Sequence, residues 1–432
     1  MSEKYTSPES FGFSPEASGM QNANALQKAL DLGGTVAVYT TGTYKIATTV
    51  YIGGNTTLIF GAGVFLEKTD ETGEFCHVIL NKGALTKVYD EHIEVRGLYV
   101  KVNGMDNRKF QVFGLHGQLA FFYVKDLKIS GFRCMDLGRA QYGIHICTFE
   151  DISVTDTIIK GDKDGVHLGK GKRFYIGGGT FETGDDAVAL NAHDYDVGNP
   201  ELGWIEDGIV ENCHDLASER RAGYFCRILA GAWVDWYEGM EVQKSDTVVH
   251  NGRLYRVRAN PDGTMYVSKT PPTHSSGIME INGISWVMVQ DDVTYTVGVR
   301  NVTFRNIFVS KHRSSAFSVH FDTGRYSRSV YPGAQLPVQE NLSFDNIRIL
   351  HKNRMPFIGV STPIDNLLVT QSSLYDNPIV FYAPAEADTF EYPPTNISLF
   401  GCVLNGRKLD SLIENRIPGK QVELISAANI EK

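Results

Sequence analysis

Four aspartates lie close together in the middle of the chain, in two short turns that glycines flank. Residues 161–165 read GDKDG, and residues 184–186 read GDD. Neighbouring carboxylates are costly to ionise together, so one member of such a group tends to keep its proton. One protonated and one ionised carboxyl are what acid/base hydrolysis of a glycosidic bond requires. The turns therefore predict catalysis more strongly than the structural alternative, in which aspartates only cap backbone N–H groups.

The spacing of the segments around these turns predicts how they stack. Residues 142–146, 164–168 and 186–190 align without a gap, each 22 residues after the one before. Small residues form one column of this alignment and apolar residues form two others, as the stacked coils of a solenoid require. Asp164 and Asp186 are therefore expected one above the other on neighbouring coils, about 4.8 Å apart.

A shorter pattern recurs along the chain and indicates the fold. It is Asn or Asp followed by alternating apolar residues, whereas helical periodicity is weak. The first two copies are 25 residues apart, and the next step, from Ile152 to Phe174, is 22 residues; strands that recur at this interval, with no helices between them, predict an all-β fold. We expect a right-handed parallel β-helix in which each coil stacks on the last. The copies begin at Asp126, Asp151, Asn301, Asn341, Asn366 and Asn396.

Two segments fall outside the coil pattern. Residues 20–32 have apolar side chains at helical spacing and stop at two glycines, which predicts a helix that caps the first coil. Residues 236–290 lose the repeat and contain an Asn251-Gly252 hairpin signal, which predicts a small inserted β module. The module resembles, in outline, three-stranded carbohydrate-binding modules of the chitin-binding type; alternatively, Trp236 and Trp286 only pack its own core. The predicted organisation is an N-terminal segment with its cap helix (1–34), a first β-helix part (35–235), the insert (236–290), a second β-helix part (291–405) and a C-terminal tail (406–432).

The composition excludes several classes of protein. With 42% hydrophobic and 21% charged residues, the chain is neither disordered nor collagen-like. The net charge of -9, without runs of like charge, argues against nucleic-acid and membrane partners. The six cysteines lack CxxC spacing and predict buried free thiols. No secretory signal is visible, so localisation stays open: extracellular or on a phage particle if the sequence is cropped or released by another route, otherwise cytoplasmic.

The two aspartate turns resemble those of glycoside hydrolase family 28, the polygalacturonases. That family has Asn-Thr-Asp at the first turn and Gly-Asp-Asp about one coil later. Its Arg-Ile-Lys motif is similar to residues 227–229, which read RIL, and residues 298–307 resemble the coil that follows this motif. The opening of the chain resembles that of β-helix proteins of the pectate-lyase superfamily. On this basis, residues 236–290 are an insertion between two family coils.

The resemblance implies an inverting hydrolysis of a polysaccharide or oligosaccharide, with no metal or other cofactor. By the family pattern, Asp185 is the general acid, and Asp164 with Asp186 holds and deprotonates the attacking water. Leu229 stands where the family has the lysine that would hold a uronate carboxylate. Arg227 keeps half of that anion clamp, so a pectin-like or other acidic or mixed glycan is the expected substrate.

Further side chains near the turns are candidates for binding the sugar. His193 lies in the interval where the family has a His-Gly pair. His145 and His167 are one coil apart and either line the sugar groove or are ordinary exposed ladder residues. Tyr142 heads the aspartate column and could stack on a sugar ring, and Lys163 adds positive charge. The substrate-binding candidates are Arg227, His167, His145, Tyr142, His193 and Lys163.

Other functions stay open beside that of a glycosidase. A phage tailspike or tail-fibre depolymerase suits the absence of a signal sequence and the inserted module, and it would be a homotrimer. A non-catalytic glycan-binding β-helix conflicts with the complete set of three aspartates. Polysaccharide lyase chemistry is disfavoured, because no Arg or Lys base is evident among the acids.

Overall fold

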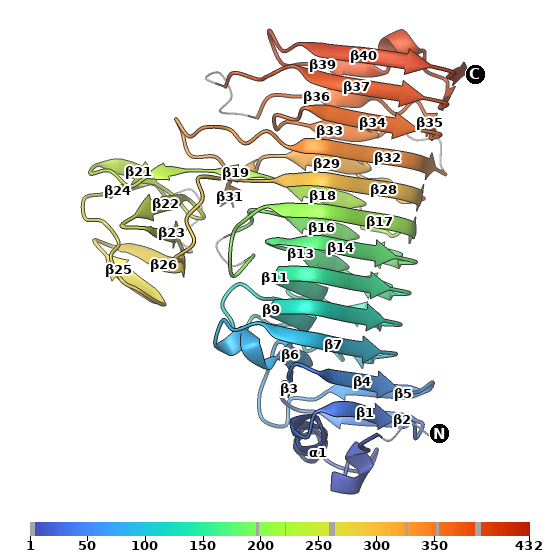
Figure 1. The fold of residues 1–432 in the computed structure, drawn as a ribbon, viewed down its shortest axis with the longest axis vertical. Helices are drawn as coiled ribbons and strands as arrows, with labels where there is room; N and C mark the ends of the chain where they lie inside the picture. The colour runs from blue at the N-terminus through green and yellow to red at the C-terminus, as the bar shows by residue number, and fades with distance from the viewer. Residues whose placement is uncertain are drawn as a thin grey trace.

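Strands of successive coils pair in parallel along the whole length of the chain and stack into an elongated column (Figure 1). The computed structural model describes residues 5–195, 198–220, 222–258, 264–324, 327–350, 354–384 and 390–432. The fold is a right-handed parallel β-helix, which confirms the prediction from the repeats. Each coil adds its apolar inward row to a continuous core, in which Phe304 and Phe344 of neighbouring coils stack 5.2 Å apart.

The coils arrange their strands in three columns. The first column contains β1 (Gly34–Val38), β4 (Thr56–Phe60), β7 (Asp90–Arg96), β9 (Gly117–Ser130), β11 (Tyr142–Thr155), β14 (Gly171–Gly177), β17 (Ile205–Asp215), β28 (Val299–Val309), β32 (Glu340–Ile349), β34 (Asn366–Thr370), β37 (Thr395–Phe400) and β40 (Val422–Ala427). The second contains β2 (Gly42–Ile46), β5 (Val64–Lys68), β8 (Tyr99–Lys101), β10 (Arg133–Leu137), β12 (Ile158–Gly161), β15 (Thr180–Thr183), β35 (Ser373–Tyr375), β38 (Val403–Asn405) and β41 (Ile430–Glu431). The third contains β3 (Val50–Ile52), β6 (Ile79–Asn81), β13 (Val166–Leu168), β16 (Val188–Asn191), β18 (Cys226–Leu229), β29 (Phe317–His320), β33 (Ile358–Val360), β36 (Ile379–Phe381) and β39 (Ile413–Asn415), together with the first halves of β9 and β11.

The strand register around the aspartate turns is the predicted one. Ile144 of β11 pairs with Val166 of β13, and Val166 pairs with Val188 of β16, in steps of 22 residues. The two aspartate turns join the second column to the third, one between β12 and β13 and the other between β15 and β16. The N–H of Gly165 donates to the carbonyl of Asp186 at 2.9 Å, so Asp164 and Asp186 lie on neighbouring coils.

The recurring Asn or Asp marks a bend in the backbone at four of its six copies. Asp126, Asp151, Asn301 and Asn341 have φ between 49° and 56°. This left-handed conformation is uncommon for most residues, but Asn and Asp tolerate it because their short polar side chains bond locally. The side chains also form a ladder between coils, since Asn341 Nδ2 donates to Asn301 Oδ1 at 3.1 Å.

The ends of the column differ in how well the sequence predicts them. Helix α1 (Gly19–Asp31) covers the first coil, as predicted, and begins with a capping box in which Ser18 and Gln21 satisfy each other's backbone N–H groups. At the other end, β39, β40 and β41 continue the three columns, so residues 406–432 belong to the coil stack and are not a separate tail. In the described part of the chain, 3-10 helices span Pro8–Phe11, Lys82–Leu85 and Leu409–Ser411.

Two predictions from composition can be compared with the described residues. All six cysteines are buried and free, which confirms that they are core thiols. Among the residues that the structure describes, no helix is long and apolar enough to cross a membrane.

The insert is a small β module on the side of the β-helix (Figure 1). Its turn at Asn251 and Gly252 has positive φ at both residues and closes a hairpin, as the dipeptide predicts. Trp286 is fully buried, and Trp236 Nε1 donates to Ser268 Oγ at 2.8 Å. Both tryptophans are therefore used in the module's own packing, and the sheet has five strands and not three. Its strands are β20 (Val234–Asp235), β22 (Thr247–His250), β23 (Arg253–Val257), β26 (Ile284–Gln290) and β25 (Ile278–Ile281), with β21 (Met240–Val242) and β24 (Tyr266–Ser268) paired beside them.

The module is attached to the β-helix by buried polar contacts as well as by its two connections. Asp246 of the module accepts from Arg328 Nε at 2.8 Å, and both side chains are almost fully buried. Trp233, just before the module, donates from Nε1 to the carbonyl of Thr294 just after it, at 2.6 Å. Two short pairs complete the junction: β19 (Gly231–Ala232) with β27 (Thr296–Val297), and β30 (Thr323–Gly324) with β31 (Ser327–Arg328).

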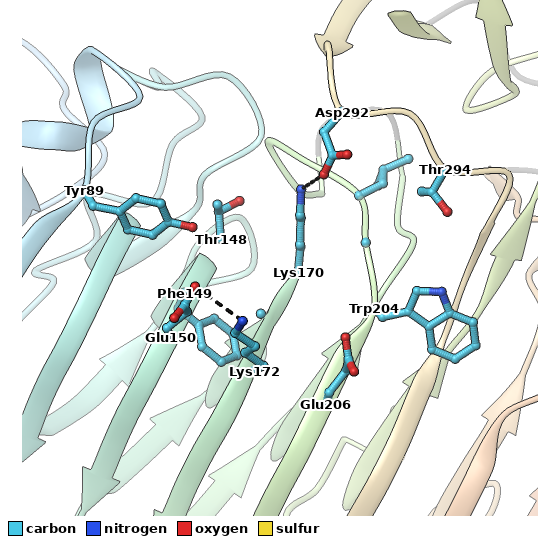
Figure 2. Close-up of a pocket in the computed structure, with 13 residues that line it drawn as sticks. Tyr89, Thr148, Phe149, Glu150, Lys170, Lys172, Trp204, Glu206, Asp292 and Thr294 are labelled. Carbon is cyan, nitrogen blue, oxygen red and sulfur yellow. Dashed lines mark hydrogen bonds and ion pairs between the residues drawn. The ribbon is translucent and has the colours of Figure 1, made fainter. Parts of the chain in front are cut away.

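A surface pocket of about 290 Å³ lies where the chain returns from the module to the β-helix (Figure 2). Trp204, just before β17, and Tyr89, just before β7, lie on opposite sides of it, with Lys170 between them. Lys170 is ion-paired at 2.8 Å with Asp292, which follows the module. The pocket combines aromatic and charged side chains, but none of the three predicted catalytic aspartates lines it.

Candidate active site

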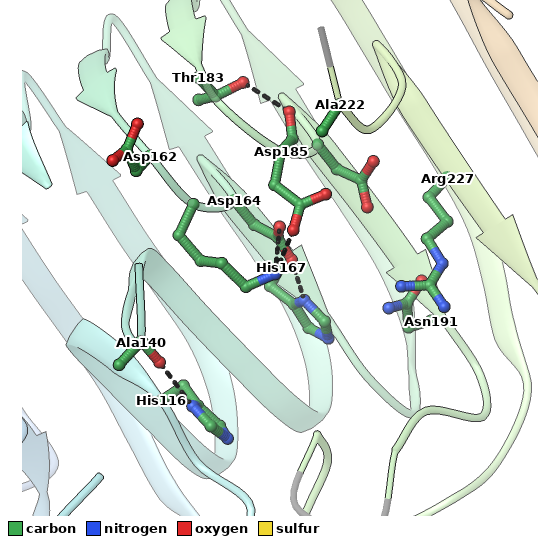
Figure 3. Close-up of polar contacts among 12 residues, drawn as sticks. His116, Ala140, Asp162, Asp164, His167, Thr183, Asp185, Asn191, Ala222 and Arg227 are labelled. Carbon is green, nitrogen blue, oxygen red and sulfur yellow. Dashed lines mark hydrogen bonds and ion pairs between the residues drawn. The ribbon is translucent and has the colours of Figure 1, made fainter. Parts of the chain in front are cut away.

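Three carboxylates converge between the two aspartate turns (Figure 3). One oxygen each of Asp164, Asp185 and Asp186 lies within 4.8 Å of the others. They differ in accessibility: the side chain of Asp185 is 25% exposed, whereas that of Asp164 is 3% exposed and Asp186 is buried. The fourth aspartate, Asp162, is outside the group and pairs with Arg139 at 3.0 Å on the surface.

A buried arginine holds the second turn in place. Arg313 Nη1 donates to the carbonyl of Asp185 at 2.8 Å, while its Nε and Nη2 bind the carboxylate of Asp215 at 3.0 and 2.8 Å. Both side chains of this ion pair are fully buried. Thr183 Oγ1 also donates to the carbonyl of Asp185, at 3.0 Å. Sequence analysis missed Arg313, because it lies 128 residues from Asp185 and matches no motif.

A glycine permits the two turns to stack this closely. A Cβ atom at Gly165 would lie 2.5 Å from the carbonyl oxygen of Ala187 on the next coil. That approach is too short for any side chain, so the small column predicted from the sequence has a steric cause.

The surroundings of Asp164 favour its ionised form. Burial alone would raise the pKa of Asp164, but the charge of Lys163 and the hydrogen bond from His167 lower it below its usual value. His167 Nδ1 lies 2.9 Å from Asp164 Oδ2. The other oxygen, Oδ1, is buried and has no hydrogen-bond partner in the protein. Asp164 is therefore an ionised carboxylate with one oxygen available.

The surroundings of Asp186 favour its protonated form. Burial, followed by the charges of Asp185 and Asp164, raises the pKa of Asp186 well above its usual value. Its Oδ1 accepts the N–H of Tyr224 at 2.7 Å. The sequence led us to expect the retained proton on Asp185. In the structure the raised pKa is that of Asp186, because Asp186 is more deeply buried than Asp185 and lies beside both other carboxylates.

Lys163 supplies the positive charge of the group. Its Nζ contacts Asp185 and lies 3.6 Å from Asp164 Oδ1. Burial would lower the pKa of Lys163, but Asp164 and Asp185 raise it, so the amine stays charged. Three such carboxylates could hold a metal ion, and here an ammonium group lies among them. Lys163 adds positive charge, as the sequence suggested, but because its amine stays charged it is a poor base for lyase chemistry.

The two stacked histidines are buried and are not the exposed ladder residues that we expected. His145 and His167 are both fully buried. Burial lowers the pKa of His145 well below its usual value. The ring of Tyr142 stacks on that of His167, with centroids 4.3 Å apart and planes within 2°. Tyr142 is itself buried, so the face predicted to bind a sugar is covered by His167. His167 itself lies on β13, and the later loop that contacts the two histidines through Asp194 and Asn199 could not be placed from the sequence.

The remaining binding candidates lie beside the group. Arg227 Nη2 is 2.6 Å from Asp322 Oδ2, so its charge is offset by a residue that sequence analysis missed. Burial alone would lower the pKa of Arg227, but Asp322 and other acidic neighbours raise it, so it stays charged. Burial lowers the pKa of His193 to about 3, and the centroid of its neutral ring lies 6.1 Å from that of the Trp233 ring.

Comparison with known proteins supports the fold and no closer relationship. No protein-family model and no curated protein sequence matches the chain. Among solved structures, the tailspike protein of E. coli bacteriophage HK620, in complex with a pentasaccharide, matches with a TM-score of 0.53 at 14% identity, covering 99% of this chain and 67% of that chain. A family 28 exopolygalacturonase of Yersinia enterocolitica matches with a TM-score of 0.49 at 13% identity (99% and 78% covered). The A-module of a mannuronan C-5 epimerase of Azotobacter vinelandii gives 0.44 at 10% identity (99% of each covered). The fold places this chain in the class of parallel β-helix proteins.

Proposed function

We propose that the protein is a glycosidase that hydrolyses a polysaccharide by acid/base catalysis with Asp164, Asp185 and Asp186. The observation that carries this proposal is the convergence of three carboxylates in unlike environments. Surroundings that lower the pKa of Asp164 and raise that of Asp186 match the need for one base and one acid in the same site.

We assign the acid function to the adjacent pair Asp185 and Asp186. Burial and the charges of Asp185 and Asp164 raise the pKa of Asp186, so Asp186 holds a proton. Asp185 is the accessible member of the pair, so we assign to it the delivery of this proton to the leaving oxygen as the bond from that oxygen to the anomeric carbon breaks. Asp164 Oδ1 takes the proton of the water that adds to the anomeric carbon. This differs from the family pattern, which would pair Asp186 with Asp164 as the base.

The stereochemical outcome is the sharpest test of this mechanism. Inverting sites usually separate their two carboxyls by about 6.5–9.5 Å and retaining sites by about 5–5.5 Å. The nearest oxygens converge within 4.8 Å here, which is closer than the usual inverting geometry. We nevertheless propose inversion, because an ionised Asp164 with a free oxygen beside a protonated partner suits the activation of water.

The charges near the group bear on the sugar. Lys163 and Arg227 are both in ion pairs with aspartates, so neither offers a full positive charge to a uronate. We therefore propose a mixed glycan, with acidic residues interspersed, in preference to fully charged polygalacturonan.

The experiment is a screen of pectic, microbial and host glycans against wild type and three variants: Asp164→Asn, Asp185→Asn and Asp186→Asn. Reducing ends report hydrolysis, absorbance of unsaturated uronates reports lyase activity, and early proton NMR reports the anomer formed. We expect each variant to lose about 10²–10⁴ in rate, with Asp162→Asn as an unaffected control.

The dependence on leaving group separates the acid from the base. The loss in Asp185→Asn should shrink on substrates with a good leaving group, whereas Asp164→Asn should be impaired on all of them. A leaving-group effect confined to Asp186→Asn would move the acid function to Asp186. Retention of configuration, or full activity in Asp185→Asn, would overturn the mechanism.

A second candidate is glycan binding without catalysis, which the pocket beside Trp204 favours. Aromatic rings with polar neighbours are a common way to bind sugars in a cleft. In affinity electrophoresis through gels containing the same glycans, Trp204→Ala should lose retardation and Asp185→Asn should not. A tailspike-type depolymerase would use the same aspartates as the first candidate, and light scattering after size exclusion would reveal it as a trimer.

A further inference from the structure

We propose that His167 and Asp194 are a buried positioning pair for Asp164, and that the inserted module holds this pair in place through Arg256. The proposal rests on the proposed function in one respect, because it assigns the pair to Asp164 as the catalytic base. It also gives the module a role in the site that does not require the module to bind carbohydrate.

His167 lies between two carboxylates. Its Nδ1 is 2.9 Å from Asp164 Oδ2, and its Nε2 is 3.3 Å from Asp194 Oδ2, an ion-pair contact without hydrogen-bond geometry. All three side chains are at most 3% exposed. A neutral imidazole has one donor nitrogen and one acceptor nitrogen, so it would turn a lone pair toward one of the carboxylates. Both contacts are favourable only when the ring is the doubly protonated imidazolium.

The other groups around His167 are compatible with this positive charge. Tyr142 stacks flat on the ring, and His145 meets it edge-on at 4.6 Å between centroids. His145 Nδ1 accepts the backbone N–H of His116 at 3.0 Å, and its Nε2 faces Asn199 Oδ1, so it carries one proton and no charge. Lys163 is on the far side of Asp164, at its Oδ1. Among the described residues, the charged groups in direct contact with the imidazole are thus the two carboxylates.

Asp194 is fixed from the loop that joins β16 to β17. Its Oδ2 accepts from Asn191 Nδ2 at 2.9 Å, and its Oδ1 accepts the N–H of Tyr195 at 2.7 Å. Arg256, on β23 of the module, is buried and donates to the carbonyls of Asp194 at 3.3 Å and Tyr195 at 3.0 Å. It also donates to the carbonyl of Asn199 at 2.7 Å. One side chain of the module therefore binds three carbonyls of this loop.

The arrangement determines which oxygen of Asp164 can act. Oδ2 is held by His167, which leaves Oδ1, without a hydrogen-bond partner among the described residues and 3.6 Å from Lys163 Nζ, for the attacking water. A cation against Oδ2 also opposes protonation of Asp164 and so keeps the base ionised at lower pH. His167 and Asp194 act through Asp164 and do not themselves contact the sugar in this scheme.

The first test reads the protonation of His167 without using activity. In protein labelled with ¹⁵N-histidine, the His167 signals, assigned with His167→Gln, should show both ring nitrogens protonated from pH 5.5 to 8. In Asp194→Asn, His167 should lose one proton within this range. Asp292→Asn, which removes the carboxylate from an exposed ion pair with Lys170, is the matched control and should change nothing. A neutral His167 in the wild type, or no change in Asp194→Asn, would overturn the proposal.

The second test uses the pH dependence of kcat on whichever glycan is cleaved. A nearby opposite charge typically lowers a carboxyl pKa by about 1–3 units. The acidic limb in Asp194→Asn should therefore move up by about one pH unit, with KM little changed. Arg256→Met should move it in the same direction, and Arg256→Lys should restore part of the shift; circular dichroism checks that each variant is folded.

The outcomes separate the two proposals. An active enzyme whose acidic limb does not move in Asp194→Asn would refute the positioning role of the pair and leave the glycosidase intact. A doubly protonated His167 in a protein that cleaves no glycan would refute the glycosidase, and with it the assignment of the pair to a catalytic base.

Discussion

Replacing Asp186 by asparagine is expected to stabilise the fold at neutral and alkaline pH while it removes most of the activity. Asparagine has the same shape, and its Oδ1 can still accept the N–H of Tyr224, which is 2.7 Å away in the wild type. It cannot become negatively charged beside Asp164 and Asp185, whose nearest oxygens lie within 4.8 Å. One substitution thus removes both a catalytic group and a source of repulsion.

The distance gives the scale of the repulsion that the substitution removes. Two unit charges 4.8 Å apart repel by about 3–4 kcal/mol at an effective dielectric constant of about 20. The wild type avoids this repulsion by keeping Asp186 protonated, because burial and the neighbouring charges raise its pKa. The gain in Asp186→Asn is therefore the free energy that the wild type loses because its folded state holds a proton that the unfolded chain would release.

The sign of the pH dependence follows from linkage. The unfolded pKa of an aspartate is about 3.9, and the folded pKa of Asp186 lies above that. Below the unfolded value the carboxyl is protonated in both states, so the variant and the wild type should be equally stable. As the pH rises from there through the folded pKa, the wild type loses stability that Asp186→Asn keeps. The difference between them should grow with pH.

Urea unfolding of both proteins at pH 4, 6, 7.5 and 9 measures this difference. Asp162→Asn is the matched control, because it is the same substitution in the neighbouring turn at a surface ion pair, and its effect should not grow with pH. An Asp186→Asn protein that is less stable than the wild type at pH 7.5, or a difference that does not change with pH, would refute the raised pKa.

Three further expectations concern residues around the site. Burial lowers the pKa of His193 to about 3. The neutral ring therefore contributes to the stability of the fold above its ordinary pKa of about 6.5, and this contribution is lost as the pH falls toward the folded pKa. His193→Gln should flatten the decline in Tm between pH 7 and 4. Arg313→Met leaves the buried Asp215 without its partner and should cost about 3–5 kcal/mol in urea unfolding with loss of activity, whereas Arg173→Met, at an exposed ion pair, should leave the midpoint nearly unchanged. Replacing 236–290 by a Gly/Ser linker should lower both Tm and activity, because the module has buried contacts with the β-helix and the site loop; a stable, active remainder would show that the module is autonomous.

The coil register and the aspartate cluster were predictable because they follow from rules that each coil repeats. A solenoid stacks like residues in columns, so the 22-residue ladder placed Asp164 beside Asp186 without knowledge of the rest of the chain. The same rule failed at the last coil. Strand β40 pairs with a neighbour on one side only, and most of its residues are partly or fully exposed. Without a buried row its sequence lacks strict apolar alternation, and residues 406–432 therefore looked like a tail.

The environment of the cluster was not predictable, because it is built by segments far away in sequence. His167 sits in a strand whose outward face would be exposed on a bare β-helix, and the loop with Asp194 and Asn199 covers that face. Arg313 and Arg256 reach the site from later coils and from the module. Such long-range polar contacts follow no local periodicity, so the sequence predicts which acids gather but not what surrounds them.

These surroundings decide which of the three acids holds the proton. Asp185 and Asp186 are neighbours in sequence, and their order alone does not distinguish an acid from a base. The positions of two cations do: Lys163 contacts Asp185 and lies 3.6 Å from Asp164, and His167 binds the other oxygen of Asp164. Asp186 is the member that neither Lys163 nor His167 contacts directly, and its chief polar contact is a neutral backbone N–H. A group of three carboxylates, two of them buried, with two adjacent cations is most stable with one proton, and that proton resides on Asp186, the carboxyl that neither cation contacts.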